Sequence, residues 1–208
     1  MEPENDKLTP TAAEVSLAQD WWMRLTDPWK QAFNETMLRR TTIEIPDDLS
    51  VHAMFTAQTL RITGPGAPFP STSVVLEDLS GIQDLRHVTI LIVTFHQVKH
   101  IRELSDLEQI SSLFVNNNQI SSLEGIEPLV NLQELYANVN KVDSLVPLSG
   151  LTGLHTLYCN YNSIRSLEGI GEEHRAQLRN FVCLPNEALP DAEIIRMERE
   201  IGIRCKKG

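Results

Sequence analysis

The sequence predicts an α/β repeat solenoid, with a parallel sheet of about six short strands on the concave face of a curved stack. Three observations predict it. Apolar residues recur every 22 positions through the middle of the 208-residue chain. Each unit holds a short apolar–x–apolar stretch, the pattern of a half-buried strand. Helical patterns flank the repeats and predict a helical N-terminal cap and a short C-terminal helical cap, which such stacks need to cover their apolar ends.

The repeat is clearest in two matching stretches, "LYANVNKV" from Leu135 and "LYCNYNSI" from Leu157. Eight columns keep the same 22-residue step over four units. The columns in and just after the strands are Leu91, Leu113, Leu135, Leu157; Val93, Val115, Ala137, Cys159; His96, Asn118, Asn140, Asn162; and Val98, Ile120, Val142, Ile164. This period, with L-x-x-L-x-L-x-x-N-x-L spacing, is the signature of a leucine-rich repeat.

The pattern continues in altered form at both ends of the repeat region. Leu60 and Ile62 predict a first strand, followed by a Pro- and Gly-rich loop at 64–73. After the fourth unit the pattern returns with two extra residues, and the insertion, which contains residues 172–174, is expected to be a solvated loop. The residues of that last unit are Leu178, Phe181, Cys183 and Asn186.

The Asn column falls where the chain leaves each strand. An Asn side chain can donate to and accept from backbone groups of its own turn and of the neighbouring turn. We therefore expect a structural ladder of asparagines, which His96 interrupts in the first full unit because a neutral imidazole has one donor. The ladder residues are Asn118, Asn140, Asn162 and Asn186.

A row of outward-facing residues is the candidate binding surface. Side chains alternate between the two faces of a strand, so Tyr136, between Leu135 and Ala137, points away from the core. The same slot in neighbouring strands gives an apolar stripe of Ile92, Phe114, Tyr136, Tyr158 and Val182. Polar neighbours and one further aromatic residue complete the predicted surface: Glu134, Asn116, Asn138, Asn160 and Tyr161. The stripe can be a stabilising cross-strand ladder or an interaction site, and these two interpretations are compatible.

The flanks predict four regions: a flexible acidic tail at 1–10, a helical cap at 11–58, the solenoid at 59–190 and a C-terminal cap and tail at 191–208. Thr11 followed by Glu14 is a capping box. Asp27 before Pro28 predicts an N-cap, after which Trp29, Phe33 and Met37 recur on one helical face. A third helix is expected from Asp47 or Asp48, and a last one over Asp191 to Glu200 that ends at Gly202.

The columns resemble the 22-residue leucine-rich repeat subfamily, which includes the internalins and a regulatory subunit of protein phosphatase 1. The resemblance covers roughly residues 74 to 190. The flanks "WWMRLTDPWKQAFNETML" and "NEALPDAEIIRMEREIGIRCKKG" resemble the ends of bacterial leucine-rich repeat proteins of mostly unassigned function. The resemblance implies a solenoid used for protein binding, and it transfers neither catalytic residues nor a partner.

Composition narrows the possible functions. A net charge of −10 disfavours nucleic-acid binding and suits a basic partner. We find no phosphate-binding loop, Cys-x-x-Cys pair or nucleophile elbow, so we expect no catalytic residues and no cofactor. A metal site at His96 and His100 is not expected, because Val98 between them is a core position.

Cysteine usage and hydropathy bear on the cellular location. No apolar run reaches the roughly 18 residues that a membrane span needs, and the polar start predicts no signal segment. With three cysteines, an odd number, we expect reduced thiols in the cytoplasm. Cys205, on the tail, is the one expected to be accessible.

These observations predict a non-catalytic module that binds a protein or peptide on the concave face, without nucleic acid or membrane contact, as a monomer or weak homo-oligomer. The alternative is an architectural protein that uses the same aromatic stripe for self-assembly.

Overall fold

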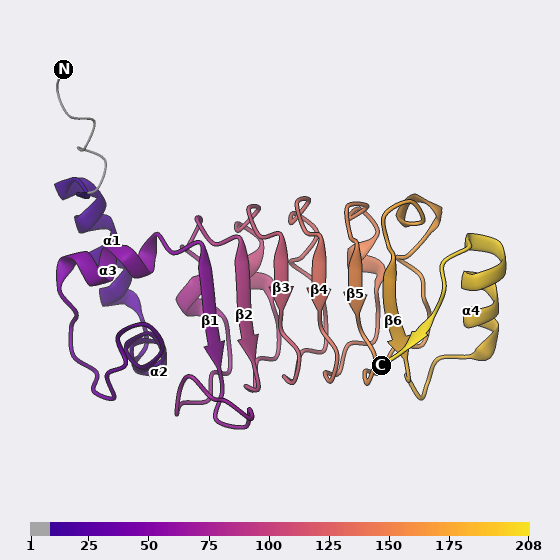
Figure 1. The fold of residues 1–208 in the computed structure, drawn as a ribbon, viewed down its shortest axis with the longest axis horizontal. Helices are drawn as coiled ribbons and strands as arrows, with labels where there is room; N and C mark the ends of the chain where they lie inside the picture. Colours follow the sequence, from indigo (N-terminus) through magenta and orange to yellow (C-terminus); the bar gives the residue numbers. More distant parts are fainter. Residues whose placement is uncertain (1–8) are drawn as a thin grey trace, which may run out of the picture.

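Seven parallel strands form one sheet whose spatial order is the chain order (Figure 1). The computed structural model describes residues 9–208, so most of the tail expected at 1–10 lies outside the described residues. The strands are β1 Thr59–Thr63, β2 Ile90–Thr94, β3 Ser112–Phe114, β4 Glu134–Tyr136, β5 Thr156–Tyr158, β6 Asn180–Leu184 and β7 Lys206–Lys207. The first six are the strands that the repeat predicts, and the seventh comes from the C-terminal tail.

The register of the sheet places members of one sequence column side by side. Leu113 pairs with Leu91 on one side and with Leu135 on the other. The long insertion after β1 and the two extra residues before β6 do not disturb this, since Leu60 pairs with Leu91 and Leu157 pairs with Phe181. Each column of the sequence is therefore a physical row across the sheet.

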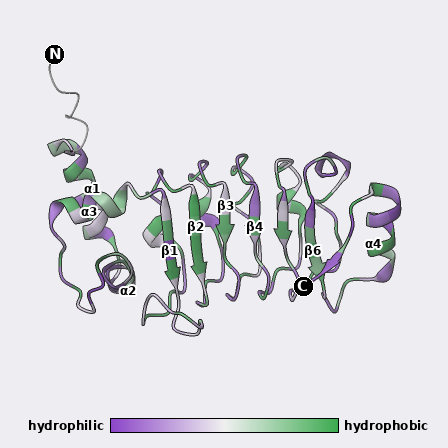
Figure 2. Cartoon of the chain, in the orientation of Figure 1, coloured by the Kyte–Doolittle hydropathy of each residue, from purple (hydrophilic) through white to green (hydrophobic). Residues whose placement is uncertain are grey.

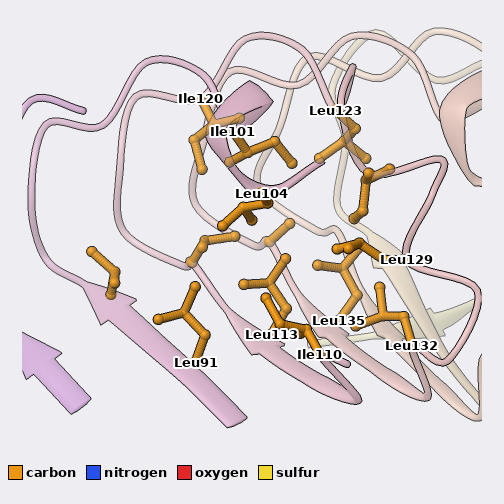
Figure 3. Packing of buried hydrophobic residues seen from close by; sticks show 14 of the residues in the cluster. Leu91, Ile101, Leu104, Ile110, Leu113, Ile120, Leu123, Leu129, Leu132 and Leu135 are labelled. Atoms are coloured by element: carbon orange, nitrogen blue, oxygen red, sulfur yellow. The ribbon is translucent and has the colours of Figure 1, made fainter. Parts of the chain in front are cut away.

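The core lies between the sheet and the return half of each repeat. Short 3₁₀ turns over Ser80–Ile82, Arg102–Leu104, Val146–Leu148 and Glu172–His174 carry part of that return half. Leu91, Leu113 and Leu135 of the strands are fully buried against Ile101, Leu104 and Leu123 (Figure 3). No repeat could bury its apolar face alone, so each depends on its neighbours.

A ladder of asparagine side chains joins each repeat to the one before it. Asn140 Oδ1 accepts from the Ile120 N–H at 2.9 Å, and its Nδ2 donates to the carbonyls of Val115 at 2.9 Å and Ala137 at 3.1 Å. The same pattern of bonds, to equivalent backbone groups, is made by Asn118, Asn162 and Asn186. One side chain thus holds two successive turns in place.

His96 occupies the ladder position in the first full repeat and is buried. Its Nδ1 accepts from the Leu76 N–H at 3.2 Å, as the Asn oxygens do in later repeats. Because Nδ1 is an acceptor, the ring is neutral. Burial lowers the pKa of His96 to about 4, against a smaller opposing effect of the Ile62 carbonyl.

Three helices cover the N-terminal end of the stack: α1 Ala12–Arg24, α2 Asp27–Phe33, extended by a wider turn over Asn34–Leu38, and α3 Asp48–Phe55. The capping box of Thr11 and Glu14 is present, and Asp47 caps α3. Trp21 Nε1 donates to the Gly81 carbonyl at 3.1 Å, which fastens α1 to the first return turn.

Two predictions about α2 are wrong in detail. Thr26, not Asp27, is its N-cap residue, and no side chain caps the helix. Met37 does not continue the buried face of Trp29 and Phe33, because it is 36% exposed. The wider turn after Phe33 shifts the helical phase, so a four-residue step no longer returns to the core side.

The C-terminal end is closed by α4 Asp191–Arg196, a wider turn over Met197–Ile201, and β7, which follows Gly202 at φ 79°. Figure 2 shows hydrophobic and hydrophilic residues mixed along α4, as in a helix with one packed side. Cys205 is buried rather than accessible, because the segment leading into β7 packs onto the stack.

The insertion before β6 is only in part the solvated loop expected, since Glu172 and Glu173 are exposed but His174 is not. His174 is fully buried there, where Nδ1 accepts from the Gly171 N–H and Nε2 lies 3.2 Å from the Leu148 carbonyl. The segment that contains the two extra residues therefore adds one side chain, His174, to the core.

We predict that Asn140→Ala destabilises the fold by about 1–3 kcal/mol, the cost of leaving buried backbone groups unpaired. Asn138→Ala, two residues earlier, removes a half-buried side chain with no hydrogen bond among the described residues and is expected to stay within about 0.5 kcal/mol. Urea unfolding of the two variants compares them directly. Equal midpoints would contradict the structural role of the ladder.

We also predict a pH dependence that belongs to His96. Its pKa is about 4 when folded and 6.5 as a reference value, so the unfolded chain binds the proton first and stability falls as pH drops from 6.5 towards 4. At pH 5 the loss relative to pH 7 is about 2 kcal/mol. His96→Asn restores the ladder residue and should remove this loss, which urea midpoints at pH 7 and pH 5 would measure.

The carboxyl group of Glu35 also makes stability depend on pH, but in a lower pH range than His96. It should therefore contribute little between pH 7 and pH 5. Burial opposes ionisation of Glu35, but hydrogen bonds from Gln31, Ser73 and Thr72 lower its pKa to about 2. Its contribution is present above pH 4.5 and is lost only as pH falls towards 2. If His96→Asn kept the parent's loss between pH 7 and pH 5, the assignment to His96 would be wrong.

Candidate protein-binding surface

Three aromatic side chains stack on the face of the sheet turned away from the core. Phe114, Tyr136 and Tyr158 come from β3, β4 and β5 and pair in register. Ring centroids are 4.5 Å apart for the first pair and 4.7 Å for the second, with interplanar angles of 11° and 19°. All three are half-buried, so their exposed faces form a continuous apolar strip at the centre of the sheet.

The row extends beyond the aromatic residues to charged ends. Arg61 pairs with Ile92, which pairs with Phe114, and at the other end Val182 pairs with Lys206. The seven strands contain four charged residues, Arg61, Glu134, Lys206 and Lys207, although the whole chain carries a charge of −10. The acidic surface therefore lies almost entirely off the sheet.

Glu134 is the one acidic residue on the strands and sits beside the aromatic strip. It accepts from Ser112 Oγ at 3.0 Å, across one strand pair. Burial, followed by the charges of Glu134 and Tyr158, raises the pKa of Tyr136. A phenol is already protonated at neutral pH, and this shift keeps the Tyr136 hydroxyl a hydrogen-bond donor to still higher pH.

Two of the residues predicted for this surface are covered in the structure. Val182 and Asn160 are 4% exposed, because the C-terminal segment forms β7 beside β6 and Gly208 lies against both side chains. Asn116 and Asn138 are half-buried and remain reachable, as does Ile92, and Tyr161 is exposed. The available strip is thus shorter at the C-terminal end than the sequence pattern implies.

A second row of residues has backbone strain that the sequence did not reveal. In four repeats the residue that follows the outward Thr or Asn has a left-handed backbone: Phe95 at φ 61°, Asn117 at 57°, Val139 at 57° and Tyr161 at 55°. Asn tolerates this conformation, but for bulky and β-branched residues it is a strained outlier. Val139 and Tyr161 are exposed, so core packing does not account for their presence.

Two properties of the described residues bear on what this face could hold. Residues 9–208 contain no group of three His, Cys, Asp or Glu side chains placed to hold a metal ion. None of the described helices has the length and apolar character needed to cross a membrane. The groups that this face presents are stacked rings, amides and a phenol, which offer apolar contact area and hydrogen bonds.

We predict that Val139→Asn raises stability by about 1 kcal/mol, the order of the cost of a left-handed backbone for an ordinary residue. The reverse substitution in the same column, Asn117→Val, should lower stability by a similar amount. Thermal and urea unfolding of both variants would measure the pair. A loss of stability in Val139→Asn would show that the backbone there is not strained by its side chain.

Comparisons with known proteins agree with this architecture. The family described as "Leucine Rich repeats (2 copies)" matches residues 130–172. The functional domain of InlJ from Listeria monocytogenes, which includes a cysteine ladder, has a TM-score of 0.63 at 22% identity over 83% of this chain and 34% of its own. No curated protein matches the chain.

Two further structures from Listeria monocytogenes share the fold. Internalin InlF has a TM-score of 0.53 at 17% identity, over 76% of this chain and 48% of its own. Internalin C2 has a TM-score of 0.50 at 19% identity, over 76% of this chain and 83% of its own. The chain spans about a third and about half of the first two structures. Residues 130–172 thus match the leucine-rich repeat family, and the chain as a whole shares its fold with these internalins.

Proposed function

We propose that this protein is a non-catalytic module that binds a polypeptide partner across the exposed face of its sheet. Leucine-rich repeat proteins generally mediate protein–protein interaction. The observation that carries the proposal here is the stack of Phe114, Tyr136 and Tyr158, half-buried before any partner is present. Such rings give large contact area with few rotatable bonds to immobilise.

The left-handed backbone positions at Phe95, Val139 and Tyr161 are a second argument that this face of the sheet is the binding face. Bulky residues held at left-handed positions cost stability, and strain of this kind concentrates at functional sites. Val139 and Tyr161 flank the aromatic strip on the side where the strands end. In the repeat before them the same position is held by Asn117, a residue type that adopts this conformation at lower cost. We infer that the Val139 and Tyr161 side chains are retained for contact with the partner, together with Asn116, Asn138 and Glu134.

The charges on the strands indicate the chemistry of the partner. A row with Arg61 at one end, Lys206 at the other and apolar rings between them suits a segment with an apolar centre and acidic residues towards its ends. At about 4.8 Å per strand step, the six steps between the two cations span roughly 29 Å. The acidic surface off the sheet, not this face, would meet a basic partner.

We predict that Tyr136→Ala and Tyr158→Ala each weaken the complex by about 2 kcal/mol or more, because binding energy concentrates in central aromatic residues. Their effect on unfolding should be smaller, about 0.2–1 kcal/mol per lost cross-strand pair. Leu135→Ala is the matched core control, with an expected loss of stability of about 2–5 kcal/mol. Calorimetric titration of a partner captured with the parent protein, against the parent and each variant, would measure the first effect.

Two outcomes would contradict the proposal. If both Tyr variants bind like the parent, the stack is only a structural ladder. If sedimentation shows that the parent is a dimer and the double Tyr variant a monomer, the stripe serves self-assembly.

A further inference from the structure

We infer that the helical N-terminal cap carries a second polypeptide-binding site, which takes a large apolar side chain flanked by Lys or Arg. The site lies between α1 and the start of α3, apart from the exposed face of the sheet. Its lining residues are Gln19, Asp20, Trp22, Met23, Ile45, Pro46, Asp48 and Val51. They enclose a hollow of ≈ 310 Å³.

The cap exposes more apolar surface than a passive cover requires. Met23 and Ile45, which border the hollow, are 63% and 73% exposed. Six of the thirteen large apolar side chains that are exposed among the described residues fall between positions 17 and 49: Leu17, Met23, Met37, Ile43, Ile45 and Leu49. Two of these six, Met23 and Ile45, border the hollow itself, and exposed apolar groups beside a hollow mark an interaction site.

Trp22 provides a local probe of the hollow. Trp22 lines the hollow and is 1% exposed, and its indole Nε1 has no hydrogen-bond partner in the described part of the chain. The other two tryptophans are satisfied, since Trp21 donates to the Gly81 carbonyl and Trp29 donates to Asp78. An unpaired buried N–H is costly, so the Trp22 indole resonance should respond to any rearrangement of the side chains around the hollow.

The charges at the rim select a basic ligand. Asp20 and Asp48 border the hollow, and none of its lining residues is basic. Among the neighbouring cations, Arg24 pairs with Asp84 at 2.9 Å, and Arg40 borders a different hollow beside Glu35 and acts on the carboxylate of Asp47. An apolar floor and two carboxylates are together complementary to a peptide with an apolar anchor and a neighbouring Lys or Arg.

The test uses the three indole N–H resonances of the ¹⁵N-labelled full chain, since all three tryptophans lie in the cap. The Trp22 resonance is identified by its loss in Trp22→Phe. The probes are the capped peptides acetyl-Arg-Lys-Leu-Phe-Lys-amide and acetyl-Glu-Asp-Leu-Phe-Glu-amide, titrated to about 1 mM, where weak sites are still detected. We expect the basic peptide to shift the Trp22 resonance and to bind at least about fivefold more tightly than the acidic one.

Matched variants separate the hollow from general attraction to an acidic protein. The pair Asp20→Asn and Asp48→Asn should weaken binding of the basic peptide at least about fivefold. The pair Glu108→Gln and Asp143→Asn, exposed acidic residues on the repeats, makes the same change in net charge and should have little effect. Melting curves of each variant confirm that the cap remains folded.

The outcome is independent of the function proposed for the sheet. Tyr136→Ala with Tyr158→Ala should leave binding of the basic peptide unchanged. An unmoved Trp22 resonance, equal binding of both peptides, equal effects of the two acidic pairs, or loss of binding in the Tyr variant would each overturn the cap site.

Discussion

The hydrogen bonds of the strand-exit asparagines are the interaction on which the rest of this structure depends. Each repeat must turn sharply as the chain leaves its strand, and the turn leaves backbone groups inside the stack that need partners. One Asn side chain satisfies groups of two successive turns, as Asn140 does for Ile120, Val115 and Ala137. With the turns fixed, the strands pair in register, and every column of the sequence becomes a row across the sheet.

Because equivalent residues of successive repeats lie side by side in the sheet, a repeated sequence produces a continuous surface. Phe114, Tyr136 and Tyr158 are distant in the chain but stack at 4.5 and 4.7 Å because the register brings them together. The same geometry repeats a strained backbone position in four units, where Phe95, Val139 and Tyr161 stand in a conformation that suits Asn better. Stability from the buried ladder thus coexists with strain on the exposed side, as expected where a surface serves binding.

Much of this could be predicted from the sequence, because periodicity determines both the fold and the direction of each side chain. The fold class, the first six strands and the outward orientation of Tyr136 follow from the 22-residue step. The parts that could not be predicted depend on contacts made by segments that do not follow the 22-residue repeat. Lys206 and Lys207 form β7 and cover Val182 and Asn160 only because the tail folds back. The buried positions of His174 and Cys205 and the hollow beside Trp22 arise in the same way, from single segments packing onto the stack.

The central claim is that the exposed face of the sheet meets another protein. Site-specific photo-crosslinking tests it most directly, with p-benzoylphenylalanine in place of Tyr136 or, as a control, of Glu124 on the return half of the preceding repeat. In a lysate of the producing cells, position 136 should yield an adduct with one distinct protein that position 124 does not give. Adducts from both positions alike, or an adduct of twice the chain mass alone, would contradict the account.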